Sequence, residues 1–580
     1  MGWKQSAPRR FNRRHFLGAA GALAGAAGLS ALSCSGGGNG SGQGGPIPGL
    51  TRETGDDETV TVAATRPALS ERHGETLRYT GYVAGDGVFD PHKTQAAPFY
   101  GQQALVLSRL LNYASQTEGI IVPDLAQALP EQPDAQTLIF RLRPDARWHE
   151  LEPLNGRPVT AEDVRFSIQR QIEGDTSFVR KGRWLVVESV EAVSTTEVKV
   201  KLTTPFANAM GLFADVNSFV VAPESEFGPS SQVGSGPFQW VEWNEGTFAS
   251  VARNPVWHGG DQRPYLDGIE LRHPKDASDI EAGLRTKKLD VVFVGRQQAD
   301  HLMKNITQLV ETNQGHSLYF GSRFFLTQPP YDDPRFRGAI SIALDRREMV
   351  DRFFAGSGDI NPWVSWPMTR WSLPQSELTN FPGYRAGAGG RDVDIAEAKE
   401  MLAAFASEKT VPSENALFVE AAAETNLGLG SLIKEQLART LGLNVTVTPL
   451  AIGDLIKKMI AQEAPWVAGP DVGWVDLDDW VYPYFHSAGS NNSFPVRDSD
   501  LDALIESQRI ETDEAKRRQT GFEIQRKILN LHAGLNFVSE RVIALQWPYV
   551  RDFPIDAADG YQHRFADCWI DRSDETFRGR

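Results

Sequence analysis

Strand-like and helix-like patterns alternate along the chain from about residue 76 onward, and this alternation most constrains its fold. In 198–202, valine or leucine alternates with lysine, which predicts a half-buried strand. Val164 and Ile168 mark the apolar face of a helix that Thr160 is placed to cap. No internal repeat is evident. Alternating elements of both kinds predict layered α/β or α+β domains.

Capping residues mark several helix ends. Asp333 precedes Pro334, which predicts an N-cap followed by a favoured first helical residue. Asp345 and Glu348 have the spacing of a capping box. Gly442 follows an apolar stripe and predicts the end of another helix.

The N-terminal segment has the layout of a secretory signal. No acidic residue comes before Glu53, and basic residues precede a short apolar run at 16–32. The segment 12–18, with Arg13 and Arg14, resembles the twin-arginine signal, through which folded proteins are exported. The alternatives are a chance arginine pair before an ordinary signal and an amphipathic organellar presequence.

Cys34 closes the segment 1–34 and resembles the lipidated cysteine of bacterial lipoproteins. That pattern prefers leucine three residues before the cysteine, where this chain has Ala31; the alternative is cleavage near Ala31, which leaves a soluble protein. Residues 35–75 are rich in Gly and Ser and then in charged residues, which predicts a flexible linker. The G-x-G-x-x-G match at 40–45 follows no strand, so we interpret it as linker rather than as a dinucleotide site.

Length, charge and cysteine content exclude several classes of protein. The chain has 580 residues, enough for two or three domains. Its formal net charge of -15 argues against a nucleic-acid partner, which requires clustered Lys and Arg. Cys34 and Cys568 are the only cysteines, so a disulfide framework or a cysteine metal site is excluded.

The sequence carries no local catalytic motif. It has no G-x-S-x-G elbow, H-E-x-x-H helix or P-loop. His149, His258 and His486 each lack a second His or Cys at a ligand spacing. We therefore predict no metal, no cofactor and no enzymatic activity.

Nine sequence blocks carry a resemblance to a known family. They lie at 89–93, 140–148, 155–164, 234–238, 253–255, 264–267, 289–292, 329–337 and 343–346. In this order they resemble the family 5 extracellular solute-binding proteins, the oligopeptide- and dipeptide-binding group of ABC importers. The second and third blocks form the most specific pair.

The resemblance implies a mixed α/β (α+β) fold of the two-lobed periplasmic-binding-protein type, type II with an extra inserted domain. The two lobes are expected to close over a central cleft. Lobe I is expected to comprise 76–113, 223–318 and 547–580, the inserted domain 114–222, and lobe II 319–546.

The resemblance also implies where a ligand binds. In peptide-binding members, a carboxylate three residues after a tryptophan pairs with the peptide amino terminus. Here the tryptophan is Trp474 and the corresponding position is Leu477. Either Asp476 or Asp478 takes the carboxylate's place, or the amine site is lost. Trp480 is a further candidate wall of the cleft.

Four residues outside this segment are also candidates for the cleft. Phe99 and Tyr100 follow the first family block, and Trp366 and Arg370 fall in a Pro-rich loop of lobe II. The alternative for each is a place in the core.

We therefore predict an extracytoplasmic or periplasmic binding protein that captures peptides or similar small solutes for the permease subunits of an ABC importer. It is expected to be a monomer with a lipid anchor at Cys34. The same scaffold with a sugar, opine or metal chelate is the first alternative, and an exported hydrolase is the second.

Overall fold

The structure is a computed structural model, and it describes residues 71–81, 83, 87–94, 97–229, 231–260, 262–421, 424–489 and 495–580. The predicted signal at 1–34, with Arg13, Arg14 and Cys34, lies outside the described residues, as does nearly all of the predicted linker. None of the described helices combines the length and the hydropathy that a bilayer span requires.

One mixed sheet runs through most of the described chain and joins twelve of its strands. Its main path is β16 (Val445–Leu450), β15 (Asn415–Glu420), β17 (Trp466–Asp471), β13 (Tyr319–Phe324), β18 (Gly534–Gln546), β11 (Val291–Phe293), β1 (Thr76–Thr80), β10 (Gly268–Arg272), β9 (Phe248–Arg253) and β8 (Phe238–Asn244). β12 (Val310–Gly315) and β14 (Gly358–Ile360) pair with β18 beside this path. Parallel and antiparallel pairs both occur, which confirms the predicted mixed fold class.

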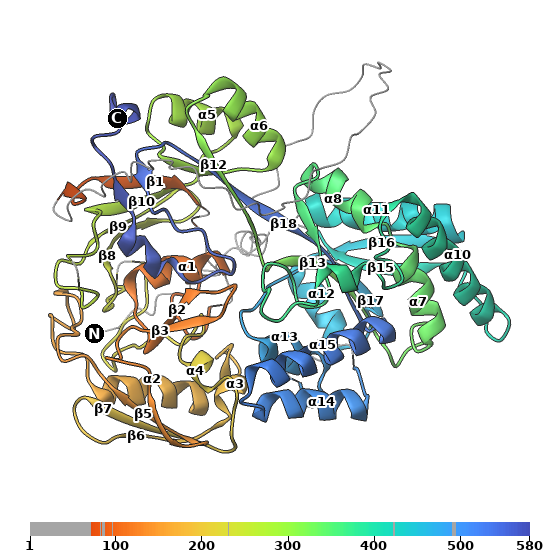
Figure 1. Cartoon of the computed structure of the whole chain (residues 1–580), viewed down its shortest axis with the longest axis horizontal. Helices are drawn as coiled ribbons and strands as arrows, with labels where there is room; N and C mark the ends of the chain where they lie inside the picture. Colours follow the sequence, from red (N-terminus) through yellow and green to blue (C-terminus); the bar gives the residue numbers. More distant parts are fainter. Residues whose placement is uncertain are drawn as a thin grey trace, which may run out of the picture.

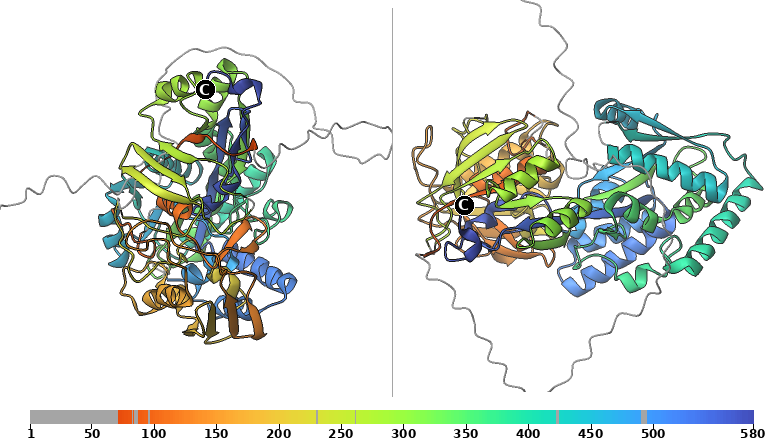
Figure 2. Two further views of the ribbon diagram at one scale, coloured as in Figure 1. Left: turned by 90° about the vertical axis from the view of Figure 1, so that its left-hand side faces the viewer. Right: turned by 90° about the horizontal axis from the view of Figure 1, so that it is seen from above.

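Strand β18 belongs to both halves of this sheet. Its beginning pairs with β13, where Val538 faces Phe320, and its end pairs with β11, where Gln546 faces Val291. Figure 1 shows β18 crossing between the left-hand and right-hand bodies of the molecule, which we call the first and second lobe. The right-hand view in Figure 2 shows the two lobes side by side, and β18 pairs with strands of both.

The first lobe collects segments that lie far apart in the sequence. Besides β1 and β8–β12 it contains α1 (Ala97–Val106), α5 (Ala277–Arg285), α6 (Arg296–Asn305), β19 (Val550–Arg551), η2 (Gln562–Asp567), β20 (Trp569–Ile570) and η3 (Glu575–Phe577). The buried carboxylate of Asp290 accepts hydrogen bonds from the backbone N of Arg78 (2.8 Å), from Tyr549 Oη (2.7 Å) and from Arg580 Nε (2.9 Å). These bonds fasten three remote segments to one point.

Within the left-hand body of Figure 1, a second, four-stranded sheet forms a unit next to the rest of the first lobe. This small-sheet unit contains β2 (Leu111–Ser115), β3 (Ile120–Pro123), β4 (Glu131–Asp134), β5 (Thr137–Arg141), β6 (Val187–Ala192), β7 (Glu197–Leu202), α2 (Ala161–Glu173), α3 (Lys181–Trp184) and α4 (Ala209–Leu212). The predicted strand at 198–202 is β7, which buries its aliphatic residues and exposes its lysines. Thr160 stands at the predicted N-cap position of α2, and its backbone N donates to the Asp163 carboxylate (2.8 Å).

The second lobe packs helices around the other half of the large sheet. These helices are α7 (Pro334–Ala343), α8 (Arg346–Phe354), α9 (Gln375–Leu378), α10 (Gly387–Ala406), α11 (Glu424–Leu441), α12 (Ile452–Ile460), α13 (Leu477–Phe485), α14 (Ser499–Ile510) and α15 (Glu514–Leu531). The predicted caps Asp333 and Asp345 begin α7 and α8, and Gly442, at φ +67°, follows α11. One buried apolar cluster continues from the small-sheet unit into α13, α14 and α15, so the lobes are in contact.

Candidate functional site

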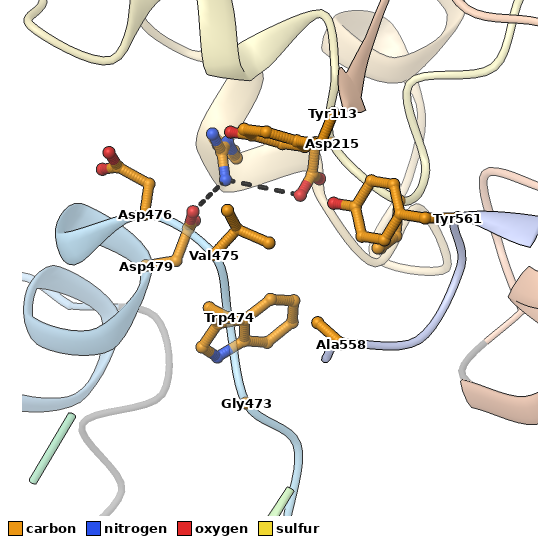
Figure 3. Close-up of a pocket in the computed structure, with 11 residues that line it drawn as sticks. Tyr113, Asp215, Gly473, Trp474, Val475, Asp476, Asp479, Ala558 and Tyr561 are labelled. Carbon is orange, nitrogen blue, oxygen red and sulfur yellow. Dashed lines mark hydrogen bonds and ion pairs between the residues drawn. The ribbon is translucent and has the colours of Figure 1, made fainter. Parts of the chain in front are cut away.

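A pocket lies where the lobes meet (Figure 3). It encloses about 260 Å³ of empty space, part of which is open to solvent. The second lobe contributes the loop 473–479, which leads into α13. The small-sheet unit contributes Tyr113, Arg183 and Asp215, and the first lobe contributes Tyr561.

Four buried charged side chains meet at the junction between the lobes. Arg180 donates to Asp215 Oδ2 from Nε (2.8 Å) and to Asp479 Oδ1 from Nη2 (3.0 Å). Arg183 pairs with the same two aspartates. All four side chains are only 8–11% exposed. Burial raises the pKa of Asp215, but the two guanidinium groups outweigh burial and its pKa is lowered. For Asp479 burial outweighs the same two guanidinium groups, and its pKa is raised.

Asp476 is held inside the second lobe. It is the N-cap of α13, where its Oδ1 accepts from the Asp478 backbone N (2.9 Å). Arg517 donates two hydrogen bonds to the same carboxylate, from Nη1 to Oδ2 (2.9 Å) and from Nη2 to Oδ1 (2.6 Å). Burial raises the pKa of Asp476, whereas Arg517 lowers it, and the net direction is down. Its charge is therefore already neutralised by a residue of its own lobe.

Asp478 and Leu477 lie in the first turn of α13 and point into the second lobe. Asp478 accepts from Gln508 Nε2 (2.6 Å) and pairs with Arg509 (3.2 Å). Leu477, which stands where peptide-binding relatives are expected to have their carboxylate, is fully buried against Gly521. The main chain thus places an apolar side chain in the core at that position.

The two tryptophans of this segment have different surroundings. Trp474 lines the pocket, with the guanidinium of Arg180 4.3 Å from its ring centroid. Trp480 is fully buried, outside the pocket lining, and its Nε1 donates to the Trp474 carbonyl (2.8 Å). Trp480 thereby holds the loop that presents Trp474.

The other four candidates lie outside the pocket lining. Phe99 is buried in the first lobe, where its ring centroid lies 5.2 Å from that of Trp243. The hydroxyl of Tyr100 donates to the Thr94 carbonyl (2.9 Å).

The backbone N of Trp366 donates to Asn361 Oδ1 (3.0 Å). Arg370 pairs with Glu514 (2.9 Å) and donates to the Gly119 carbonyl of the small-sheet unit (3.2 Å). Arg370 therefore links the lobes away from the pocket.

Sequence reasoning missed most of the pocket on the first-lobe side. Tyr113, Arg180, Arg183, Asp215 and Tyr561 were not among the candidates. The arginines stand in a short basic run, 180–183, before Trp184. A basic run can indicate acidic partners, but this one does not indicate that the partner is Asp479, almost 300 residues later.

The described residues show no grouping of three or more His, Cys, Asp or Glu suited to a metal ion. His149, His258 and His486 all have structural hydrogen bonds. His149 accepts from the Gly234 backbone N (3.1 Å), His258 bonds to Asp124 (2.8 Å), and His486 bonds to Glu506 (3.1 Å).

Comparison with known proteins identifies relatives of this arrangement. The family described as "Bacterial extracellular solute-binding proteins, family 5 Middle" matches residues 121–493. The glutathione-binding protein GsiB of Pectobacterium atrosepticum is 26% identical over 239 residues, which is 40% of this chain and 45% of the relative. The chain thus spans about half the length of the curated relatives it matches.

Two solved structures share the fold. The periplasmic binding protein DppA of Helicobacter pylori, in complex with the peptide STSA, matches with a TM-score of 0.71 at 18% identity, over 87% of this chain and 99% of DppA. AgaA of A. tumefaciens R10, in complex with agropinic acid, matches with a TM-score of 0.67 at 20% identity, over 85% of this chain and 98% of AgaA.

Proposed function

Because the chain belongs to the bacterial extracellular solute-binding proteins of family 5, we propose that it captures a peptide or similar small solute outside the cytoplasm and delivers it to an ABC importer. Members of this family bind solutes without transforming them. The observation that carries the proposal is the pocket between the lobes, which draws side chains from both of them.

Binding is proposed to proceed by hinge closure. The pocket is smaller than the ~300–1,000 Å³ usual for small-molecule sites, so the lobes have to part before a solute is admitted. Strand β18 is continuous through both lobes and is the expected axis of this motion. Closure then replaces water around the solute with side chains of both lobes. The predicted division into lobe I, inserted domain and lobe II is kept as part of this proposal.

The ligand residues are likewise part of the proposal. Trp474 is proposed as a wall of the site, since it lines the pocket. Asp476 or Asp478 as the partner of a ligand amine stays a prediction. For either to serve, the ligand has to compete with Arg517 or Arg509. Phe99, Tyr100, Trp366, Arg370 and Trp480 would support the site from its surroundings.

A non-peptide solute is the second candidate. Leu477 stands where the peptide-binding relatives are expected to have an aspartate, and AgaA, which shares the fold, is described with agropinic acid bound. A sugar, opine or metal chelate remains open on these grounds. An exported hydrolase is the least supported reading.

The proposed location is the outer face of the cell membrane. Arg13 and Arg14 would direct twin-arginine export, and Cys34 would carry the lipid. Mass spectrometry of the processed N-terminal peptide tests this: a diacylglyceryl cysteine supports the anchor, whereas a free N-terminus near Ala31 contradicts it. A Cys34→Ala variant is expected in the soluble fraction.

The identity of the solute is tested by native mass spectrometry of the protein purified from its own cells. We expect a single compound of low mass that is released unchanged on denaturation. Conversion of that compound into a product by the purified protein would exclude a binding protein.

A further inference from the structure

Three polar groups at the pocket have no hydrogen-bond partner among the described residues. Arg183 Nε is buried without one, on a side chain that is 9% exposed. Tyr113 and Tyr561 are 4% and 2% exposed, and neither hydroxyl has a partner within the described part of the chain. Figure 3 shows both rings facing the pocket, with no dashed line at either hydroxyl. Buried polar groups are normally paired, so Arg183 Nε calls for a ligand or water, and the two hydroxyls can bond to the same molecule.

These groups are neutral hydrogen-bonding groups or belong to a cation whose charge is already balanced. Burial raises the pKa of Tyr113 well above its usual value, and that of Tyr561 as well, so both hydroxyls keep their protons. Arg183 Nε can only donate. The three therefore suit hydroxyl or carbonyl oxygens of a bound molecule.

The charges at the pocket leave no place for a further ion. Arg180 and Arg183 face Asp215 and Asp479, so two guanidinium groups are matched by two carboxyl groups. Asp476 is paired with Arg517. An ammonium group that takes Asp479 has to displace both arginines, which then share Asp215 alone. Leaving a buried charge uncompensated costs about 3–5 kcal/mol.

We propose that this pocket receives an uncharged part of the ligand, rich in hydroxyl or carbonyl oxygens, and disfavours a free ammonium group there. The inference rests on the proposed solute-binding function and narrows its ligand class. Sugars and peptides with a blocked amino terminus share this chemistry. Trp474 and the two tyrosine rings add apolar faces against which such molecules pack.

Calorimetry on the purified protein tests the charge preference. The panel compares trialanine and triglycine with their N-acetylated amides, and adds mono- and disaccharides. We expect at least one neutral compound to bind, and no free-amine peptide to bind more tightly than its blocked form. Tighter binding of a free peptide by about tenfold, or no binding by any neutral compound, overturns the inference. Which neutral arm binds distinguishes a sugar from a blocked peptide.

Two conservative variants test the residues. Tyr113→Phe and Tyr561→Phe each remove one hydroxyl and are expected to weaken binding of the neutral compound by about tenfold. Tyr331→Phe is the matched control, because Tyr331 is buried in the second lobe away from the pocket. Unchanged affinity in both pocket variants contradicts the inference.

The two proposals fail separately. If a co-purified solute places a free ammonium group at the pocket, the proposed preference for an uncharged group is wrong, whereas solute capture is supported. Turnover of the solute sinks solute capture itself.

Discussion

At the scale of single residues, Asp476 combines two structural tasks in one carboxylate. It caps α13 and neutralises Arg517, so its removal leaves a buried guanidinium without a counter-ion. We expect Asp476→Ala to lower the free energy of unfolding by about 3–5 kcal/mol.

Urea denaturation checks this expectation. Asp476→Asn is the control, since an amide oxygen still caps the helix but carries no charge. If the loss in the Ala variant is the same as in the Asn variant, the cap contributes little. If neither variant loses stability, the buried Asp476–Arg517 pair does not stabilise the fold.

Asp556 gives a prediction about pH. Its side chain is 8% exposed, beside Arg564 and Gln116. Burial raises the pKa of Asp556 to about 6, despite the opposing effect of Arg564. The folded chain therefore holds this proton more tightly than the unfolded chain. The resulting stability is complete below pH ~4 and is lost as the pH rises through about 6.

Asp556→Asn removes this titration. The variant is expected to gain about 2–3 kcal/mol relative to the natural chain between pH 4 and pH 7. Urea unfolding of both proteins across this range measures the difference. Parallel stability curves would show that Asp556 titrates normally.

At the scale of elements, the start of α2 depends on a local network. The buried Asp163 carboxylate accepts from the Thr160 backbone N (2.8 Å) and pairs with Arg157 (2.7 Å). We expect Asp163→Ala to cost about 1–3 kcal/mol in unfolding free energy. Glu162→Ala, one residue earlier and exposed, is the matched control and should cost less than about 0.5 kcal/mol. Equal losses by thermal or urea unfolding would contradict this account.

Elements of this kind were predictable from the sequence because their signals are local. Thr160, Asp333, Asp345 and Gly442 each determine the end of a helix within a few residues, and the structure confirms all four. Alternation in 198–202 likewise identifies β7 and its buried face.

The candidate site was less predictable because it is assembled by tertiary contacts. Asp476 lines the pocket and Asp478 lies in the same segment, but no sequence pattern shows that Arg517 and Arg509 pair with them. Asp479 was not predicted as a site residue, although it is the aspartate that pairs with arginines of the small-sheet unit. The register of α13 decides which side chain faces the pocket.

At the scale of the whole molecule, the arginine–aspartate group joins the lobes. Replacing Arg180 and Arg183 together with Met leaves Asp215 and Asp479 facing each other without cations. Repulsion between them should open the ligand-free protein.

Small-angle X-ray scattering measures this opening as a larger radius of gyration. The control is the double variant Arg352→Met and Arg439→Met, which removes exposed pairs within the second lobe. An unchanged radius in the pocket variant would show that other contacts hold the lobes together.

The first lobe has a further consequence for biogenesis. β1 pairs with β10 and β11, yet Asp290, which directly precedes β11, is also bonded to Tyr549 and Arg580. A ribosome, at about 5–20 residues per second, releases β1 several hundred residues before Tyr549. For that whole interval the unfinished lobe exposes apolar surface. Chaperones that shield nascent chains are therefore expected to matter more to the yield of this protein than its final stability does.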